Sequence, residues 1–110
     1  MAWFSTGVAM ATLSPGSLHE VDINGQTIVL AQIGQHVYAL GGICTHQGGI
    51  LSNGQLDGDR ITCGEHGGVF DARTGRVLAD AFGIEPPSGS TEPLKVYPTQ
   101  VRDGLIEIEL

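Results

Sequence analysis

Both cysteines and two of the four histidines of this 110-residue chain lie in two short, similar segments. Residues 44–49 read C-T-H-Q-G-G, and residues 63–68 read C-G-E-H-G-G. Each segment places one thiol and one imidazole close together, with two adjacent glycines after them. Thiolate sulfur and imidazole nitrogen are the donors that zinc and iron–sulfur centres use. The pattern predicts one metal centre with four ligands: Cys44, His46, Cys63 and His66.

The residues between the two segments must bring them together. This stretch contains Asn53-Gly54 and Asp57-Gly58, which favour tight turns because Asn, Asp and Gly tolerate positive φ. A reversing β segment over residues 50–62 would return the chain beside its start. The two ligand segments would then face one another.

The distribution of donors favours an iron–sulfur cluster. Structural zinc sites usually take two cysteines from one short segment and two histidines from another, whereas each segment here supplies one of each. A 2Fe–2S cluster with two Cys on one iron and two His on the other suits such a mixture. Glycines also let backbone N–H groups approach sulfur closely. A zinc site, a Cys44–Cys63 disulfide and two buried thiols are the alternatives.

Short strands joined by turns must position these segments. Turn signals separate runs that alternate or are rich in β-branched residues, and no window shows a helical stripe. An all-β fold is therefore predicted, an antiparallel β-sandwich or small barrel, in which the long proline-containing stretch 80–93 is a loop. The expected strands cover residues 7–13, 18–23, 26–33, 36–40, 95–97 and 105–110. The other histidines, His19 and His36, are expected at the surface with no metal role.

Composition excludes several classes of function. Twelve acidic and five basic residues give a net charge of −7, which disfavours nucleic acid and anionic membranes as partners. No apolar run approaches the ~20 residues of a membrane-spanning helix, and no basic segment typical of a secretion signal begins the chain. Two cysteines are also too few for the disulfide framework of a small secreted domain. We expect a single cytoplasmic domain.

The ligand pattern resembles that of the Rieske iron–sulfur proteins. Besides C-T-H at 44–46 and C-x-x-H-G at 63–67, the family's features are matched by Phe70-Asp71, Thr74-Gly75 and the stretch 92–98. The resemblance covers about residues 7–110. It implies one Rieske domain over 1–110, whose fold is an antiparallel β-sandwich base with a small inserted cluster-binding β subdomain. The base would comprise residues 1–42 and 94–110, and the subdomain about 43–93.

The resemblance also implies the roles of the ligands. Cys44 and Cys63 would bind the inner iron, and His46 and His66 the outer iron, of one 2Fe–2S cluster per chain. Residues 86–89 would correspond to the proline-containing loop that covers the cluster.

Departures from the family pattern indicate the subclass. Rieske subunits of quinol-oxidising complexes carry two further cysteines where this chain has Gly49 and Glu65, and usually a serine and a tyrosine where it has Gly68 and Phe70. A hydrogen bond to the cluster stabilises the reduced state more than the oxidised state. If the difference is ~1.4 kcal/mol, each missing hydrogen bond lowers the reduction potential by ~59 mV. A low potential is predicted, as in soluble Rieske ferredoxins.

That subclass implies a one-electron carrier that is not itself an enzyme. It would pass electrons from a flavin-dependent ferredoxin reductase to a terminal Rieske non-haem iron oxygenase, in aromatic hydrocarbon catabolism or a related pathway. The alternatives are a redox subunit similar to the small subunit of nitrite reductases, and a zinc-binding interaction module. Acidic residues could steer docking or serve solubility alone: Glu20, Asp22, Asp57, Asp59, Glu65, Asp80 and Glu85.

Overall fold

The computed structural model describes residues 2–44, 49–64, 67–80, 83–88 and 91–110. The regular structure in this part of the chain is β, apart from the 3-10 turns η1 (Met10–Thr12) and η2 (Leu51–Asn53). The described residues contain no helix with the length and apolarity needed to cross a membrane. The strands are β1 (Trp3–Ala9), β2 (Leu18–Ile23), β3 (Gln26–Ile33), β4 (His36–Gly41), β5 (Gln55–Asp57), β6 (Arg60–Thr62), β7 (Val69–Asp71), β8 (Val77–Ala79), β9 (Val96–Tyr97), β10 (Thr99–Arg102) and β11 (Leu105–Glu109).

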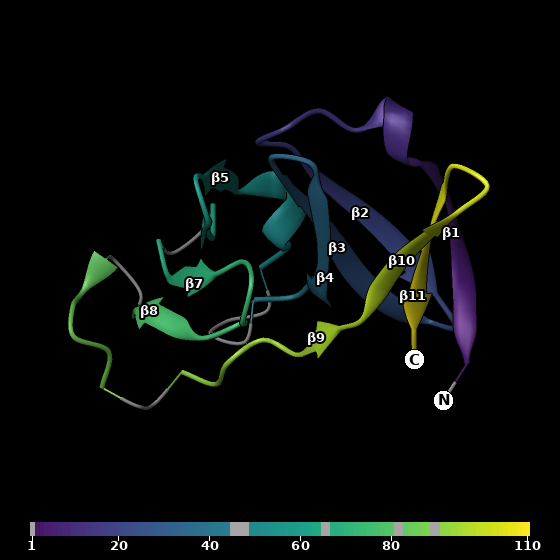
Figure 1. Ribbon diagram of the computed structural model, residues 1–110. Helices are drawn as coiled ribbons and strands as arrows, with labels where there is room; N and C mark the ends of the chain where they lie inside the picture. The colour runs from purple at the N-terminus through teal and green to yellow at the C-terminus, as the bar shows by residue number, and fades with distance from the viewer. Residues whose placement is uncertain (1, 45–48, 65–66, 81–82, 89–90) are drawn as a thin grey trace.

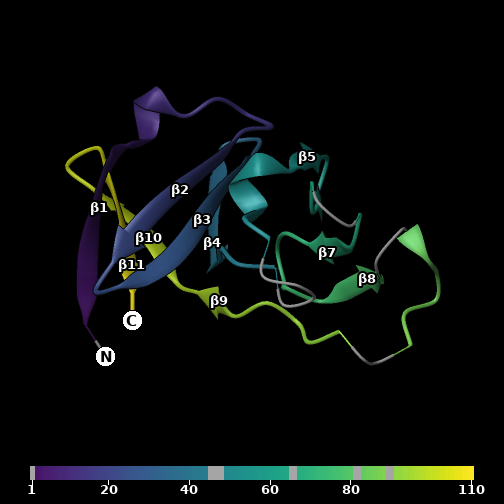
Figure 2. The same ribbon diagram turned by 180° about the vertical axis from the view of Figure 1, so that it is seen from behind.

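The strands form three antiparallel sheets, in the orders β1-β11-β10, β2-β3-β4-β9 and β5-β6-β7-β8. The first two sheets draw on both ends of the chain, whereas the third consists of consecutive strands inserted between β4 and β9. Figures 1 and 2 show the third sheet to one side of the other two. The predicted fold, an antiparallel base with a small inserted β unit, is confirmed.

Local turn chemistry accounts for two of the hairpins. Asn24 and Gly25 both have positive φ, 52° and 76°, and join β2 to β3 with Ile23 paired to Gln26. These are the values that a two-residue hairpin turn requires, and Asn-Gly is well suited to them. Asp103 and Gly104, at 53° and 79°, connect β10 to β11 in the same way.

Strand β3 contributes to two cores because both of its faces are buried. Ile28 and Leu30 point into a cluster shared with Ile106 and Ile108 of β11. Val29 and Ala31 point to the other side, into a cluster that includes both cysteines. The middle sheet is therefore a layer between the outer base sheet and the region that contains the thiols.

The first strand begins and ends earlier than the predicted 7–13. It covers Trp3–Ala9, and a 3-10 turn follows. The register explains the difference, because Ala9 pairs with Leu105, the first residue of β11, and no partner strand continues beyond it. The amide of Met10 then donates to the Gly104 carbonyl at 2.9 Å. The long loop expected over 80–93 agrees with its described residues, where Asp80 and Ile84 form an isolated bridge.

Candidate metal centre

The second ligand segment lies at one end of the inserted sheet. Thr62 ends β6 and pairs with Val69, the first residue of β7, so the intervening residues form the connection between these two strands. Ala79, the last residue of β8, also pairs with Val69. Cys63 and the segment that begins at Asp80 therefore start from the same edge of the sheet.

Backbone hydrogen bonds close both ligand segments in the same way. The Cys44 amide donates to the Gly49 carbonyl at 2.6 Å, and the Cys63 amide donates to the Gly68 carbonyl at 2.8 Å. Each bond joins a cysteine to the residue five positions later. The two segments are matched loops, as their similar sequences predict.

The first loop is held at its base by neighbouring strand-like residues. Ile43 and Ile50 form an isolated antiparallel bridge on either side of it. The Leu51 amide also donates to the Gly42 carbonyl at 2.9 Å. The loop therefore leaves and re-enters the structure at one place, as a hairpin does.

Two glycines allow the connection between the loops to lie against the second loop. A Cβ atom on Gly54 would lie 2.0 Å from the Thr62 carbonyl oxygen, and one on Gly64 would lie 2.9 Å from the Asn53 carbonyl oxygen. Real Cβ atoms do not approach backbone oxygen so closely. The turn at residues 51–54 can pack beside Cys63 only because these positions have no side chain.

The thiols of Cys44 and Cys63 share one buried cluster. Each cysteine is only 2% exposed, and Leu51 and Phe70 belong to the same cluster. Neither cysteine is in a disulfide, so the alternative of a Cys44–Cys63 bridge is not supported. Two thiols brought together under an apolar cover, on two matched loops, are a donor set that fits an iron of a 2Fe–2S cluster.

The other predicted ligands, His46 and His66, lie outside the described residues, as does Glu65. Among the described residues no further group of three or more His, Cys, Asp or Glu side chains could hold a metal ion. His19 and His36 are exposed on β2 and β4, as expected.

The hydroxyl donors of high-potential relatives have no counterpart at the two described positions. Phe70 is fully buried among the residues that surround the thiols. A Cβ on Gly68 would lie 3.7 Å from the Ala79 carbonyl oxygen, an ordinary contact. The site therefore has room for a small side chain at position 68 that the sequence does not use.

Asp80 was expected only as a charge for docking or solubility, but its side chain also accepts hydrogen bonds within the chain. The carboxylate accepts hydrogen bonds from the Ser88 amide at 2.7 Å and from the Thr91 hydroxyl at 3.0 Å. The sequence places this aspartate directly after a strand and before a proline-containing loop. That position is the feature of the sequence that could have indicated these hydrogen bonds.

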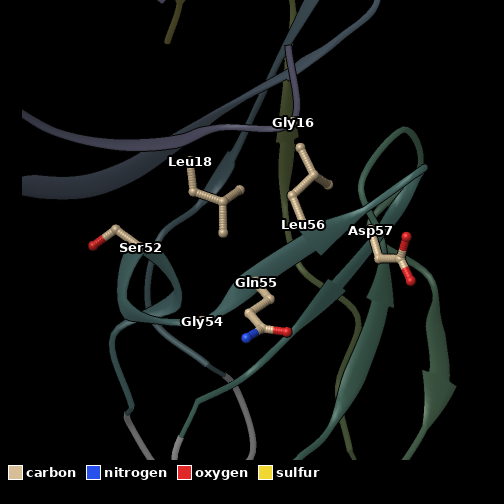
Figure 3. Close-up of a pocket in the computed structure, with 7 residues that line it drawn as sticks. All are labelled: Gly16, Leu18, Ser52, Gly54, Gln55, Leu56 and Asp57. Atoms are coloured by element: carbon tan, nitrogen blue, oxygen red, sulfur yellow. The ribbon is translucent and has the colours of Figure 1, made fainter. Parts of the chain in front are cut away.

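A separate hollow of about 530 Å³ lies where the base meets the inserted sheet (Figure 3). The Ser52 hydroxyl and a Glu20 carboxylate oxygen, 3.3 Å apart, bridge the two parts nearby. Among the described residues, no cysteine or histidine lines the hollow. Its lining residues are Gly16, Leu18, Ser52, Gly54, Gln55, Leu56 and Asp57.

The family model of the Rieske [2Fe-2S] domain matches residues 5–98 of the chain. The chain belongs to the Rieske [2Fe-2S] family. It therefore carries the family's 2Fe–2S cluster, and the zinc alternative is set aside. The curated relatives include the biphenyl dioxygenase ferredoxin subunit of Pseudomonas sp. (strain KKS102), 34% identical over 94% of this chain and 91% of the relative. The ferredoxin component of the naphthalene 1,2-dioxygenase system of Pseudomonas putida is 29% identical with the same coverage.

Solved structures give the same result for the fold. The ferredoxin of Sphingomonas yanoikuyae B1 has a TM-score of 0.83 and is 26% identical, with 99% of each chain covered. A structure described as a complex of reduced oxygenase and oxidised ferredoxin in carbazole 1,9a-dioxygenase has a TM-score of 0.82, at 32% identity, over 96% of this chain and 91% of that one. The Rieske fold is confirmed, and the ferredoxin relatives support a non-catalytic electron carrier.

Proposed function

We propose that this Rieske protein is the ferredoxin that carries single electrons from a flavin-dependent ferredoxin reductase to a terminal Rieske non-haem iron oxygenase. The observation that carries the proposal is the pair of buried cysteines on matched loops, in a chain whose relatives include the ferredoxin components of oxygenase systems. The bound cluster supplies the chemistry, which is the gain and loss of one electron. An aromatic or similarly apolar compound would be the substrate of the oxygenase.

The ligand set proposed is Cys44 and Cys63 for the inner iron and His46 and His66 for the outer iron. The burial of both cysteines supports the inner position, because a thiolate-bound iron away from water keeps its ligands protected from exchange. The matched hydrogen bonds of the two loops support one cysteine from each.

The domain boundaries proposed are a base of residues 1–42 and 94–110 and a cluster-binding subdomain of about 43–93. The distribution of the sheets supports them, since the strands of the inserted sheet lie within residues 55–79. The buried cluster around Cys44 and Cys63 lies between this sheet and β3.

The cytoplasm is the proposed location, without a membrane or nucleic-acid partner. A net charge of −7 supports the exclusion of polyanions. The same charge is compatible with docking to a basic face of a reductase or oxygenase.

Electron transfer to an oxygenase tests this function. The reduced protein would be mixed anaerobically with the oxidised terminal oxygenases of naphthalene, biphenyl and carbazole systems, and its visible absorption followed by stopped flow. We expect at least one oxygenase to reoxidise it much faster than buffer does. Reoxidation at the buffer rate with every oxygenase would contradict the proposal, and bovine serum albumin at equal concentration is the control for non-specific effects.

A further inference from the structure

Residues 94 and 95, here called the return segment, join the inserted sheet to the base. The Leu94 amide donates to the Gly75 carbonyl, in the turn between β7 and β8, at 2.9 Å. The Lys95 carbonyl accepts from the amide of Gly41, the last residue of β4, also at 2.9 Å. In Figure 1 the chain at this point leads from the side of the inserted sheet to β9 at the base. Two successive residues therefore bond one to each part of the molecule.

These two hydrogen bonds reach the stems of different ligand loops. Gly41 stands three residues before Cys44, which begins the first loop. The Gly75 amide donates at 2.7 Å to the carbonyl of Asp71, the last residue of β7, and β7 is the strand that follows the second loop. The first loop thus extends from a base strand and the second from the inserted sheet. The return segment consequently helps to set the spacing of the two loops.

The turn that contains Gly75 is held firmly by its own contacts. The Asp71 amide donates to the Arg76 carbonyl at 2.8 Å, and the Asp71 carboxylate accepts from the Arg73 amide at 2.8 Å. The Arg73 guanidinium also lies 2.8 Å from the carboxylate of Asp59, in the turn between β5 and β6. Because these contacts tie the turn to two hairpins of the inserted sheet, it cannot move away from the return segment by itself.

Gly75 has no room for a side chain on the side of the return segment. A Cβ there would overlap the Leu94 carbonyl oxygen, and it would lie 3.0 Å from the Leu94 carbonyl carbon and 3.1 Å from Val96 Cγ2. The φ of Gly75 is 76°, a value that also favours glycine. Gly58, in the β5–β6 turn, has a φ of 61°, but a Cβ there would meet nothing within 4 Å. The two glycines share a left-handed backbone and differ in their contacts.

We propose that Gly75 is a positioning residue for the metal centre: its close contact with Leu94 sets the spacing of the two ligand loops. This proposal rests on the proposed function, in which each loop supplies one cysteine and one histidine to a single 2Fe–2S cluster. Leu94 is 5% exposed and belongs to the buried group of residues that contains Cys44 and Cys63. A displaced return segment would therefore also loosen the apolar cover of the thiols. Gly75 acts through Leu94 and does not bind iron.

The test compares Gly75→Ala with Gly58→Ala in the cluster-loaded protein. Both variants place alanine at a positive φ in a turn of the inserted sheet, but only Gly75→Ala pushes against the return segment. We expect Gly75→Ala alone to accelerate the bleaching of visible absorption by an iron chelator, by about tenfold, an effect of the size that overpacking produces.

The reduction potential is the readout that a loss of stability alone would not move. We expect it to rise in Gly75→Ala, because water admitted to the site stabilises the negative charge that reduction adds. At a fixed applied potential the ratio of reduced to oxidised protein should change at least about twofold relative to Gly58→Ala. Equal potentials or equal bleaching of the two variants would overturn the proposal, because the contact with Leu94 would then have no effect on the centre.

Amide hydrogen exchange in the wild-type protein is a second test, which does not require either variant to fold. The Leu94 and Gly41 amides should exchange at least about tenfold more slowly than the amide of the exposed Gly58. A Leu94 amide that exchanges as fast as that of Gly58 would overturn the proposal, because Gly75 would then not hold the return segment. Any of these failures in a coloured protein leaves the proposed function standing, whereas a colourless wild-type protein would contradict the proposed function and this role with it.

Discussion

The amide of Cys63 donates a hydrogen bond to the carbonyl oxygen of Gly68, and the separation is 2.8 Å. The same bond closes the loop of Cys44, five residues before Gly49. The spacing of cysteine and histidine differs, C-x-H in one loop and C-x-x-H in the other. The hydrogen bond that closes each loop nevertheless spans the same number of residues. Each cysteine therefore occupies an equivalent place in its loop, and both thiols enter one buried cluster.

We predict that Gly54→Ala destabilises the site more than a typical surface substitution. The new Cβ would lie 2.0 Å from the Thr62 carbonyl oxygen, so the turn must move away from the second loop. Overpacking of this kind lowers the free energy of unfolding by about 1–3 kcal/mol. Urea unfolding measures it, with Gly41→Ala as the control because its nearest contact would be 3.9 Å away. Equal stability of the two variants would contradict the close approach.

A hydroxyl at position 68 should raise the reduction potential. In Gly68→Ser the Cβ has ordinary contacts, and the hydroxyl can donate toward the cluster. A hydrogen bond worth ~1.4 kcal/mol more in the reduced state raises the potential by about 59 mV. Protein-film voltammetry compares Gly68→Ser with Gly68→Ala, which adds the carbon without the donor. Equal potentials would show that this position does not reach the cluster.

The two cores should respond differently to the same truncation. Leu51 and Leu30 are both fully buried, but only Leu51 shares its cluster with the cysteines. Replacing either by Ala should lower the free energy of unfolding by about 2–5 kcal/mol. Only Leu51→Ala should also accelerate the loss of visible absorption under a chelator. Equal bleaching of the two variants would contradict the assignment of the site to this cluster.

Replacing Glu65 tests whether acidic charge steers docking to the oxygenase, because this residue belongs to the second ligand segment. If steering operates, Glu65→Gln should lower the rate of electron transfer to an oxygenase at low salt by up to about fivefold. The effect should disappear at high salt through screening. Asp103→Asn, on the β10–β11 hairpin, is the control. A rate and a salt dependence equal to those of wild type would leave solubility as the role of this charge.

Local chemistry made much of the fold predictable. The turns at Asn24-Gly25 and Asp103-Gly104 depend on two residues each, and their φ values are those that these residue types favour. The donor types at Cys44 and Cys63 likewise indicated a shared centre, and the structure buries both in one cluster.

Features set by distant partners were not predictable in this way. The end of β1 at Ala9 is set by where β11 begins, at Leu105.

 Ala9 pairs with Leu105, and this pairing joins the two ends of the chain. The bond between Thr91 and Asp80, and the approach of Gly54 to Thr62, also depend on where the folded chain places each partner. Neither contact leaves a repeating pattern in the sequence, so only the structure reveals them.

The central claim is that one 2Fe–2S cluster is held by two cysteines and two histidines of this chain. Pulsed electron paramagnetic resonance of the dithionite-reduced protein tests it most directly, because it detects magnetic coupling between the cluster's unpaired electron and ligand nitrogen. We predict couplings to two imidazole nitrogens, from His46 and His66. A reduced cluster without imidazole coupling, or a protein with no paramagnetic signal that holds zinc, would contradict the claim.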